Sequence, residues 1–169
     1  MSGIILRFCL FCALIGGAFF WFVTQPSFLA KDWVAHSSDA DAGALVFAAA
    51  GCASCHVAPT AEKSDPPVLS GGRAFVSDFG TFYAPNISSD AALGIGNWTQ
   101  REFAQALLKG VSPDGAHYYP AFPYTAYARM TSKDIGDLYA YVQTLPASNV
   151  DSIAHEISFP FSIRRSVGG

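Results

Sequence analysis

The sequence predicts an all-α domain preceded by a single membrane-spanning helix. Three later segments carry helix signals, near residues 42–50, 99–109 and 131–144, and the first 23 residues are almost entirely apolar. Charged residues make up only 14% of the chain, against about 25% in typical soluble domains. Such a composition favours a membrane segment, a buried cofactor or both. The net charge of −3, without any basic run, gives no support for nucleic-acid binding.

The N-terminal segment is long enough to cross a membrane. Residues 4–23 are apolar apart from Arg7, and a helix of about 20 residues rises about 30 Å, the thickness of the hydrocarbon core. Trp21 and Phe22 suit the interface at the far end, and Arg7 can extend to the near side. Because positive charge marks the cytoplasmic side, we expect the chain after Lys31 to lie on the opposite side of the membrane.

A cleaved signal peptide is the alternative to an anchor. Cleavage requires small residues at positions −3 and −1, and cutting after residue 30 or 35 would place Phe28 or Trp33 at −3. The sequence therefore favours an uncleaved anchor. Cys9 and Cys12 lie within this apolar segment, where free cysteines usually fill apolar space, and we assign them no chemistry.

The first helix of the domain follows a polar linker over residues 31–38. It begins near Asp39 or Asp41, either of which can cap it, and runs through residues 42–50. We divide the chain accordingly. The expected parts are an anchor (1–30), the linker, a domain (39–150), and a C-terminal extension (151–169) that packs on the domain or trails from it.

The second and third helices have clear boundaries. Thr99 and Glu102 form a capping box, and Gly110 ends the second helix. The third helix begins after Thr131, with Asp134 at the box position, and ends near residue 144. We expect residues 57–80 and 111–129 to be non-helical. One apolar stripe marks the buried face of the third helix: Ile135, Leu138, Tyr141, Val142 and Leu145.

The most informative stretch is Gly51-Cys52-Ala53-Ser54-Cys55-His56. Two cysteines three positions apart, followed directly by a histidine, are typical of a c-type haem attachment site. On a helix Cys52 and Cys55 lie about one turn apart, so both thiols can reach the two vinyl groups on one haem edge. His56 then lies beneath the iron as its proximal ligand. The motif predicts one covalently attached haem c.

Other interpretations of the motif need features that the sequence lacks. A thioredoxin-like dithiol would lie near a βαβ pattern, and a zinc site needs two more cysteine or histidine ligands at suitable spacing. The only other cysteines, Cys9 and Cys12, belong to the apolar segment. Trp98, just before the second helix, either packs in the core or contacts the haem edge.

The segment 66–73 contains prolines, a leucine and then an arginine. It resembles the loop of small cytochromes c, in which proline and leucine follow the haem histidine and precede an arginine. By that resemblance, a carbonyl near Pro67 would accept a hydrogen bond from the other ring N–H of His56. Arg73 would pair with a haem propionate; a solvated surface charge is the alternative for this side chain.

Four further segments, over residues 79–87, 94–98, 119–130 and 159–165, carry a broader resemblance. They are similar to the membrane-associated cytochromes c, which include the cytochrome subunits of bacterial membrane-bound alcohol and gluconate dehydrogenases. The resemblance covers roughly residues 41–165 and implies a cytochrome c fold, with three main helices around one haem. Those subunits often carry three haems, whereas this sequence has one attachment motif.

Three side chains are candidates for the sixth iron ligand. Met1 and Met130 are the only methionines, and Met130 lies just before the last helix, where small cytochromes c place their ligand. Its distance from that helix is shorter than usual, and many relatives carry a second methionine where this chain has Phe122. His117 and His155 are the alternatives. Both His/Met and His/His pairs hold haem iron, and the first raises the potential.

These observations predict an electron-transfer protein and not an enzyme. We expect one transmembrane helix to attach this carrier to the bacterial inner membrane, with the haem domain in the periplasm. It would take electrons from a periplasmic dehydrogenase and pass them to a terminal oxidase or another cytochrome. The alternatives are a haem-based ligand sensor or peroxidase-like enzyme with an open sixth site, and a membrane-tethered dithiol oxidoreductase using Cys52 and Cys55.

Overall fold

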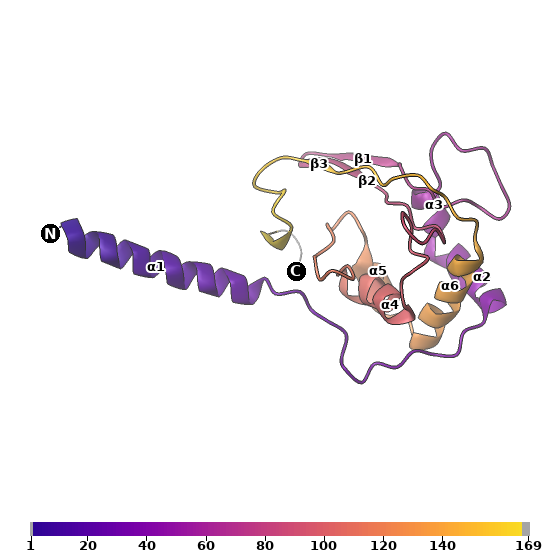
Figure 1. Cartoon of the computed structure of the whole chain (residues 1–169), viewed down its shortest axis with the longest axis horizontal. Coiled ribbons are helices and arrows are strands. Elements are labelled where there is room, and N and C mark those ends of the chain that lie inside the picture. The colour runs from indigo at the N-terminus through magenta and orange to yellow at the C-terminus, as the bar shows by residue number, and fades with distance from the viewer. Residues whose placement is uncertain (1, 167–169) are drawn as a thin grey trace.

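The computed structural model describes residues 2–166 and is mainly helical. α1 (Ser2–Val23) stands apart from the domain, as Figure 1 shows, and the domain is built around α2 (Ala40–Ala50), α4 (Gln100–Lys109) and α6 (Ser132–Thr144). The remaining elements are short: α3 (Cys52–His56), α5 (Tyr124–Tyr127), the 3₁₀ turn η1 (Arg164–Ser166), and the strands β1 (Ala74–Ser77), β2 (Gly80–Tyr83) and β3 (Glu156–Ile157).

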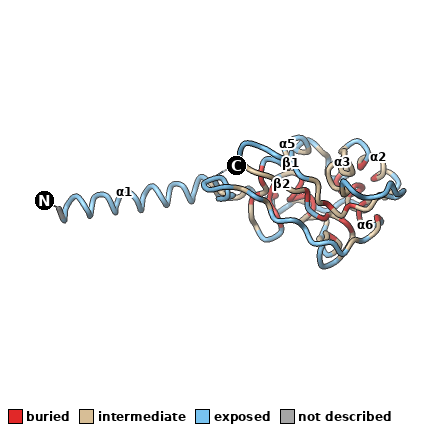
Figure 2. The backbone as a smooth tube through the Cα atoms, turned by 90° about the horizontal axis from the view of Figure 1, so that it is seen from above, coloured by how far each residue is buried: buried red, intermediate tan, exposed pale blue. Residues whose placement is uncertain are grey.

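α1 differs from the domain helices in being exposed along its length. Figure 2 shows it in pale blue, with the buried positions confined to the domain. Within the described residues, one helix is long and apolar enough to cross a membrane: Gly3–Val23, with a mean hydropathy of 2.2 and none of its length buried. The helix fits the predicted anchor, and a signal sequence would have the same features.

The core forms where α2 crosses α6. Gly43 of α2 lies so close to the backbone of α6 that an added Cβ would stand 2.0 Å from the carbonyl oxygen of Asp137. Next to this contact, the rings of Phe47 and Tyr141 lie 5.2 Å apart. The largest fully buried apolar side chains of this core are Leu69, from the loop after α3, and Ile135, Leu138 and Val142 of α6.

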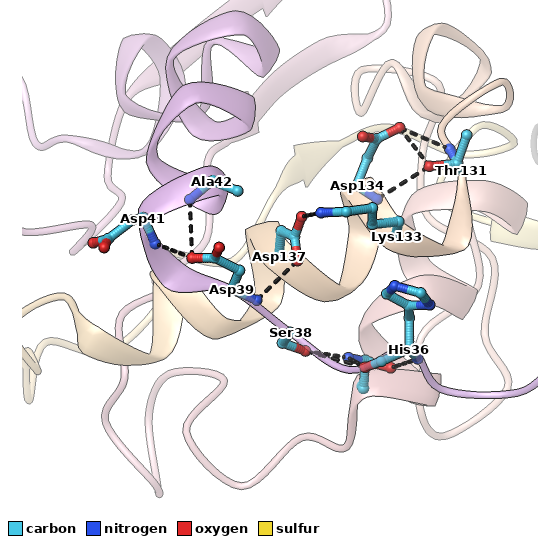
Figure 3. A network of polar contacts seen from close by, with 10 residues as sticks. His36, Ser38, Asp39, Asp41, Ala42, Thr131, Lys133, Asp134 and Asp137 are labelled. Atoms are coloured by element: carbon cyan, nitrogen blue, oxygen red, sulfur yellow. Dashed lines mark hydrogen bonds and ion pairs between the residues drawn. The ribbon is translucent and has the colours of Figure 1, made fainter.

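A polar network fixes the same crossing at the start of α2 (Figure 3). Asp39 is the N-cap, and its side chain accepts from the backbone N–H groups of Asp41 and Ala42. The backbone N–H of Asp39 in turn donates to Asp137 of α6 at 2.9 Å. Asp137 also pairs with Lys133, and this hydrogen bond lowers the pKa of the buried carboxyl. The bond from the Asp39 backbone to the Asp137 side chain thus joins the first and last helices of the domain, and Lys133 holds the Asp137 carboxylate in place.

The predicted capping boxes are confirmed at both remaining helices. Thr99 and Glu102 exchange hydrogen bonds at the start of α4, and Gly110 ends the helix at φ +62°. Thr131 and Asp134 do the same for α6. Each pair depends on residues three apart in the chain, which explains why the sequence reveals it.

A small antiparallel sheet and a single helical turn were not predicted. β1 and β2 form a hairpin in which Phe75 lies opposite Phe82, and β3 adds to the other side of β2. Every residue of β1 is exposed, so no alternation of buried and exposed positions marks it. α5 is one turn within the segment 111–129. The all-α prediction holds for the core, and its loop assignment for residues 74–77 is wrong.

The segment before α2 is attached to the domain. We call residues 24–38 the strap. The backbone N–H of Leu29 donates to the Gln105 side chain at 2.7 Å, and that of His36 donates to the Gln100 side chain at 2.8 Å. Arg101 donates to the carbonyl of Leu29. The linker predicted at 31–38 is therefore held along α4 by polar side chains, which no local pattern in the sequence indicates.

Candidate haem-binding site

The attachment motif occupies its own short helix. α2 ends at Gly51, which adopts a left-handed conformation at φ +70° and lets the chain turn at once into α3. Cys52, Cys55 and His56 all lie on α3. The spacing of the cysteines therefore corresponds to one helical turn, as their separation in the sequence predicts.

The Cys52 thiol lies in an environment that does not suit dithiol redox chemistry. Both thiols of the motif are free, and Cys52 packs against the hydrophobic core. Burial raises the pKa of Cys52 to about 11, whereas reactive redox cysteines have depressed pKa values. Within residues 2–166, no three His, Cys, Asp or Glu side chains come together as a metal cluster. Neither the dithiol nor the zinc interpretation gains support.

His56 is held by one ring nitrogen. Its Nδ1 lies 2.8 Å from the carbonyl oxygen of Pro85, which accepts the Nδ1–H hydrogen bond. Burial lowers the pKa of His56, and the Pro85 carbonyl partly opposes this shift. The neutral tautomer that results carries its lone pair on Nε2. That is the form and orientation in which an imidazole binds iron.

The predicted partner of His56 was the wrong proline. Pro67 lies half-buried in the loop after the motif, and the acceptor is the carbonyl of Pro85 instead. The hairpin explains the difference, because it returns the chain so that Ile87 donates to Leu69. The segment 84–87 thereby lies beside the segment 69–73. The proline whose carbonyl accepts from His56 therefore comes from the segment after the hairpin and not from the loop that follows the motif.

Gly71 makes this arrangement possible and was missed by sequence reasoning. Its backbone N–H donates to the carbonyl of His56 at 2.7 Å. At φ +75°, an added Cβ would stand 2.6 Å from the Pro85 carbonyl oxygen. Only glycine allows the Pro85 backbone to approach so closely. The consecutive pair Gly71-Gly72 was the available signal, since adjacent glycines often mark a close backbone approach.

Asn86 fixes the position of the Pro85 backbone from the other side. Its side chain is buried and donates to the carbonyls of Ser148 and Val150, both at 2.8 Å. Its amide oxygen accepts from the backbone N–H of Ser88. The chain after α6 is thereby joined to the residue next to the His56 acceptor.

Arg73 carries an orphaned buried donor. Its Nε is the one buried side-chain nitrogen or oxygen without a hydrogen-bond partner in the described part of the chain. A buried guanidinium N–H without a partner costs free energy of about 1–3 kcal/mol or more. An anionic group at this position, such as a haem propionate, would satisfy it.

Met130 lies between α5 and α6 and packs partly against the core. It lines an open hollow of about 590 Å³ together with Ala50 and Tyr127. The Tyr127 hydroxyl donates to the Ala50 carbonyl at 3.1 Å. Burial raises the pKa of Tyr127, and the nearby thiols of Cys52 and Cys55 add to the shift. The segment that carries Met130 is thus joined to the chain entering the attachment motif.

Both histidines considered as sixth ligands have other partners. His117 is buried, and its Nε2 lies 3.1 Å from the carbonyl oxygen of Thr24, at the end of α1. His155 accepts from the backbone N–H of Tyr83 through Nδ1. Trp98 packs partly against the core, and its carbonyl accepts from Tyr139 at 2.7 Å. The core contact agrees with the packing interpretation of Trp98.

The residues present fit a c-type haem. α3 offers two thiols and a neutral imidazole whose orientation is already fixed, and Arg73 offers a buried donor without a partner. Cys52 and Cys55 would form the thioethers, and His56 would bind the iron. This donor set is that of a c-type haem domain.

Comparison with known proteins identifies the family. The family model described as cytochrome c matches residues 40–146. A protein named "Diheme cytochrome c-type" from Cereibacter sphaeroides is 45% identical over 92% of this chain and 53% of its own length. The fructose dehydrogenase cytochrome subunit of Gluconobacter japonicus is 41% identical over 79% of this chain and 27% of its own. The cytochrome c subunit of the quinone alcohol dehydrogenase of Gluconobacter oxydans is 38% identical over 79% and 28%.

The chain belongs to the cytochrome c family, and its domain is an electron-transfer module rather than a catalytic one. The predicted fold and the resemblance to dehydrogenase cytochrome subunits are confirmed. The chain spans about half the length of the first of these relatives and under a third of the other two.

Proposed function

We propose that the chain is a membrane-attached, one-electron carrier with a single haem c. α1 remains in the inner membrane, and the domain lies in the periplasm. The carrier takes electrons from a periplasmic dehydrogenase and passes them toward the respiratory chain. Relatives named as cytochrome subunits of fructose, alcohol and gluconate dehydrogenases support a dehydrogenase as donor. The apolar, exposed α1 supports the membrane attachment.

One observation carries this proposal: paired thiols and a histidine fixed by a backbone carbonyl lie on one helical turn. When bound, the haem supplies a ferric–ferrous couple that moves one electron. Cys52 and Cys55 attach it covalently, so it stays in place in either state. His56 binds through Nε2, and the Pro85 carbonyl prevents the ring from turning. Arg73 offsets negative charge at the edge of the site.

The test uses the two cysteine pairs of the chain. Cys52→Ser/Cys55→Ser is expected to abolish covalent haem, measured by haem-dependent peroxidase staining after denaturing electrophoresis of membranes. Cys9→Ser/Cys12→Ser has the same spacing within α1 and is the matched control; it should retain full staining. Acid–acetone extraction that removes all haem from the unaltered protein would refute the proposal.

We propose Met130 as the sixth ligand, because it lines a hollow together with Ala50, next to the attachment motif. His117 lies against Thr24 instead, and His155 accepts from Tyr83 through Nδ1, which leaves the ring proton on Nε2. Met130→Ala is expected to abolish the red charge-transfer band of Met-ligated ferric haem and to allow the ferrous protein to bind carbon monoxide. The potential should fall on the order of 0.1 V, since axial ligands set haem potentials over a range of about 0.8 V. His117→Gln should leave the band unchanged. Carbon monoxide binding by the unaltered protein would instead favour the sensor or peroxidase-like alternative.

A further inference from the structure

One face of the domain exposes apolar side chains from two segments. We call it the hairpin–tail patch, and it combines the β1–β2 hairpin with the chain after β3. The rings of Phe79 and Phe161 lie 4.7 Å apart and connect the two segments. A groove of about 570 Å³ runs between them, lined by Phe75, Phe82 and neighbouring residues. The most exposed large side chains of the patch are Val76, at 84%, and Phe159, at 79%.

The patch lies next to the end of α1. The Arg165 guanidinium stands 3.8 Å from the centre of the Trp21 ring, and it donates to the Thr24 carbonyl at 3.5 Å. His117 contacts the same carbonyl at 3.1 Å. In Figures 1 and 2 the η1 turn lies beside the point where α1 meets the domain. Groups that contact Trp21 and Thr24 stand where a spanning helix leaves the hydrocarbon core.

The charges around the patch suit a phosphate-bearing surface. Arg164 and Arg165 follow one another at η1, and Arg164 also stands 5.3 Å from the centre of the Tyr119 ring. The one carboxylate in the hairpin turn is Asp78. Glu156 of β3 is engaged by the Tyr83 hydroxyl. Aromatic side chains beside arginines are the composition that lies at the headgroup level of a membrane.

We propose that the hairpin–tail patch rests in the headgroup region of the bilayer that α1 spans. Its apolar side chains enter the boundary between headgroups and acyl chains, and Arg164 and Arg165 contact lipid phosphates. The inference rests on the proposed retention of α1 in the membrane. It specifies which side of the haem domain faces the membrane, and it leaves the opposite side, with α2 and α6, open to soluble proteins.

The test places a nitroxide label on the holoprotein in single-copy nanodiscs of zwitterionic and anionic lipid. All variants carry Cys9→Ser/Cys12→Ser, so that the label reacts with one introduced thiol. Phe159→Cys reports on the patch. Leu45→Cys on α2 is the control, because Leu45 is 76% exposed and Phe159 is 79% exposed. We expect the ratio of oxygen to nickel-chelate collisions to be several-fold higher at 159 than at 45.

Equal ratios at the two positions would overturn the proposal and leave the patch as a surface for a protein partner. A label at 159 shielded from both reagents would also overturn it, because the chain itself would then cover the patch. Intact mass after reconstitution tests the anchor separately, since cleavage near residue 30 would remove the basis of the proposed attachment. Arg164→Gln/Arg165→Gln should lower the ratio at 159 in anionic nanodiscs while the haem spectrum stays unchanged.

Discussion

Gly71→Ala is expected to disrupt the haem site without touching a haem ligand. The new Cβ would meet the Pro85 carbonyl, so the carbonyl must move and the His56 hydrogen bond lengthens or breaks. Loss of such a supporting bond typically weakens metal binding 10–100-fold. We expect His56 to dissociate from iron at lower guanidinium concentration, followed by the haem absorption band. The reduction potential should rise, because an imidazole without this bond donates less electron density.

Gly72→Ala is the matched control for this prediction. Gly72 has a similar left-handed conformation, at φ +86°, yet an added Cβ would meet only Ile153, at 3.9 Å. Both substitutions therefore place an alanine in the left-handed region, at a cost of roughly 1–2 kcal/mol. Only Gly71→Ala displaces the acceptor of His56. If both variants show the same potential as the unaltered protein, Gly71 has no positioning role and the effect is backbone strain alone.

Gly43→Ala should destabilise the domain where α2 crosses α6. An added Cβ would stand 2.0 Å from the Asp137 carbonyl oxygen and 2.8 Å from the Cβ of Tyr141. α2 must therefore move away from α6, and overpacking of this kind costs about 1–3 kcal/mol or more. The higher helix propensity of alanine offsets about 1 kcal/mol of this cost. We expect a net loss of about 2 kcal/mol in guanidinium unfolding of the holoprotein, followed by circular dichroism.

Leu45→Ala is the control on the same helix. Leu45 is 76% exposed, so its truncation should change the free energy of unfolding by less than about 0.5 kcal/mol. Gly43→Ala with the same stability as Leu45→Ala would mean that α2 and α6 can separate without cost. The close crossing would then have no part in holding the domain together.

The features that the sequence predicts well are those encoded over a few residues. The attachment motif spans residues 52–56, and the capping box of α4 spans Thr99 and Glu102. Each forms within one helical turn, so neighbouring residues are enough to specify it. The apolar stripe of α6 repeats within one helix in the same way. These local patterns placed the core helices correctly, and the motif that predicts haem attachment lies on a single short helix.

The features that were missed depend on contacts between distant segments. Pro85 lies 29 residues after His56 and reaches it only because the hairpin returns the chain. The backbone N–H of Leu29 donates to the side chain of Gln105, which lies 76 residues later in the chain. No short pattern encodes such a pairing, and the resemblance to small cytochromes c pointed to Pro67, in the loop after the motif, instead of Pro85. The exposed β1 strand lacks the alternation by which a strand is recognised.

The strap limits how far the domain can travel from the lipid. A flexible segment of about 15 residues would let its two ends separate by about 20 Å and explore all directions. Here the side chains of Gln100, Arg101 and Gln105 hydrogen-bond residues 29–36 to α4. The distance between the end of α1 and the domain can therefore vary little. In the proposed membrane-bound carrier, the haem keeps a constant height above the bilayer and cannot swing between donor and acceptor. Its encounters then depend on lateral diffusion, and each redox partner must present its own site at that height.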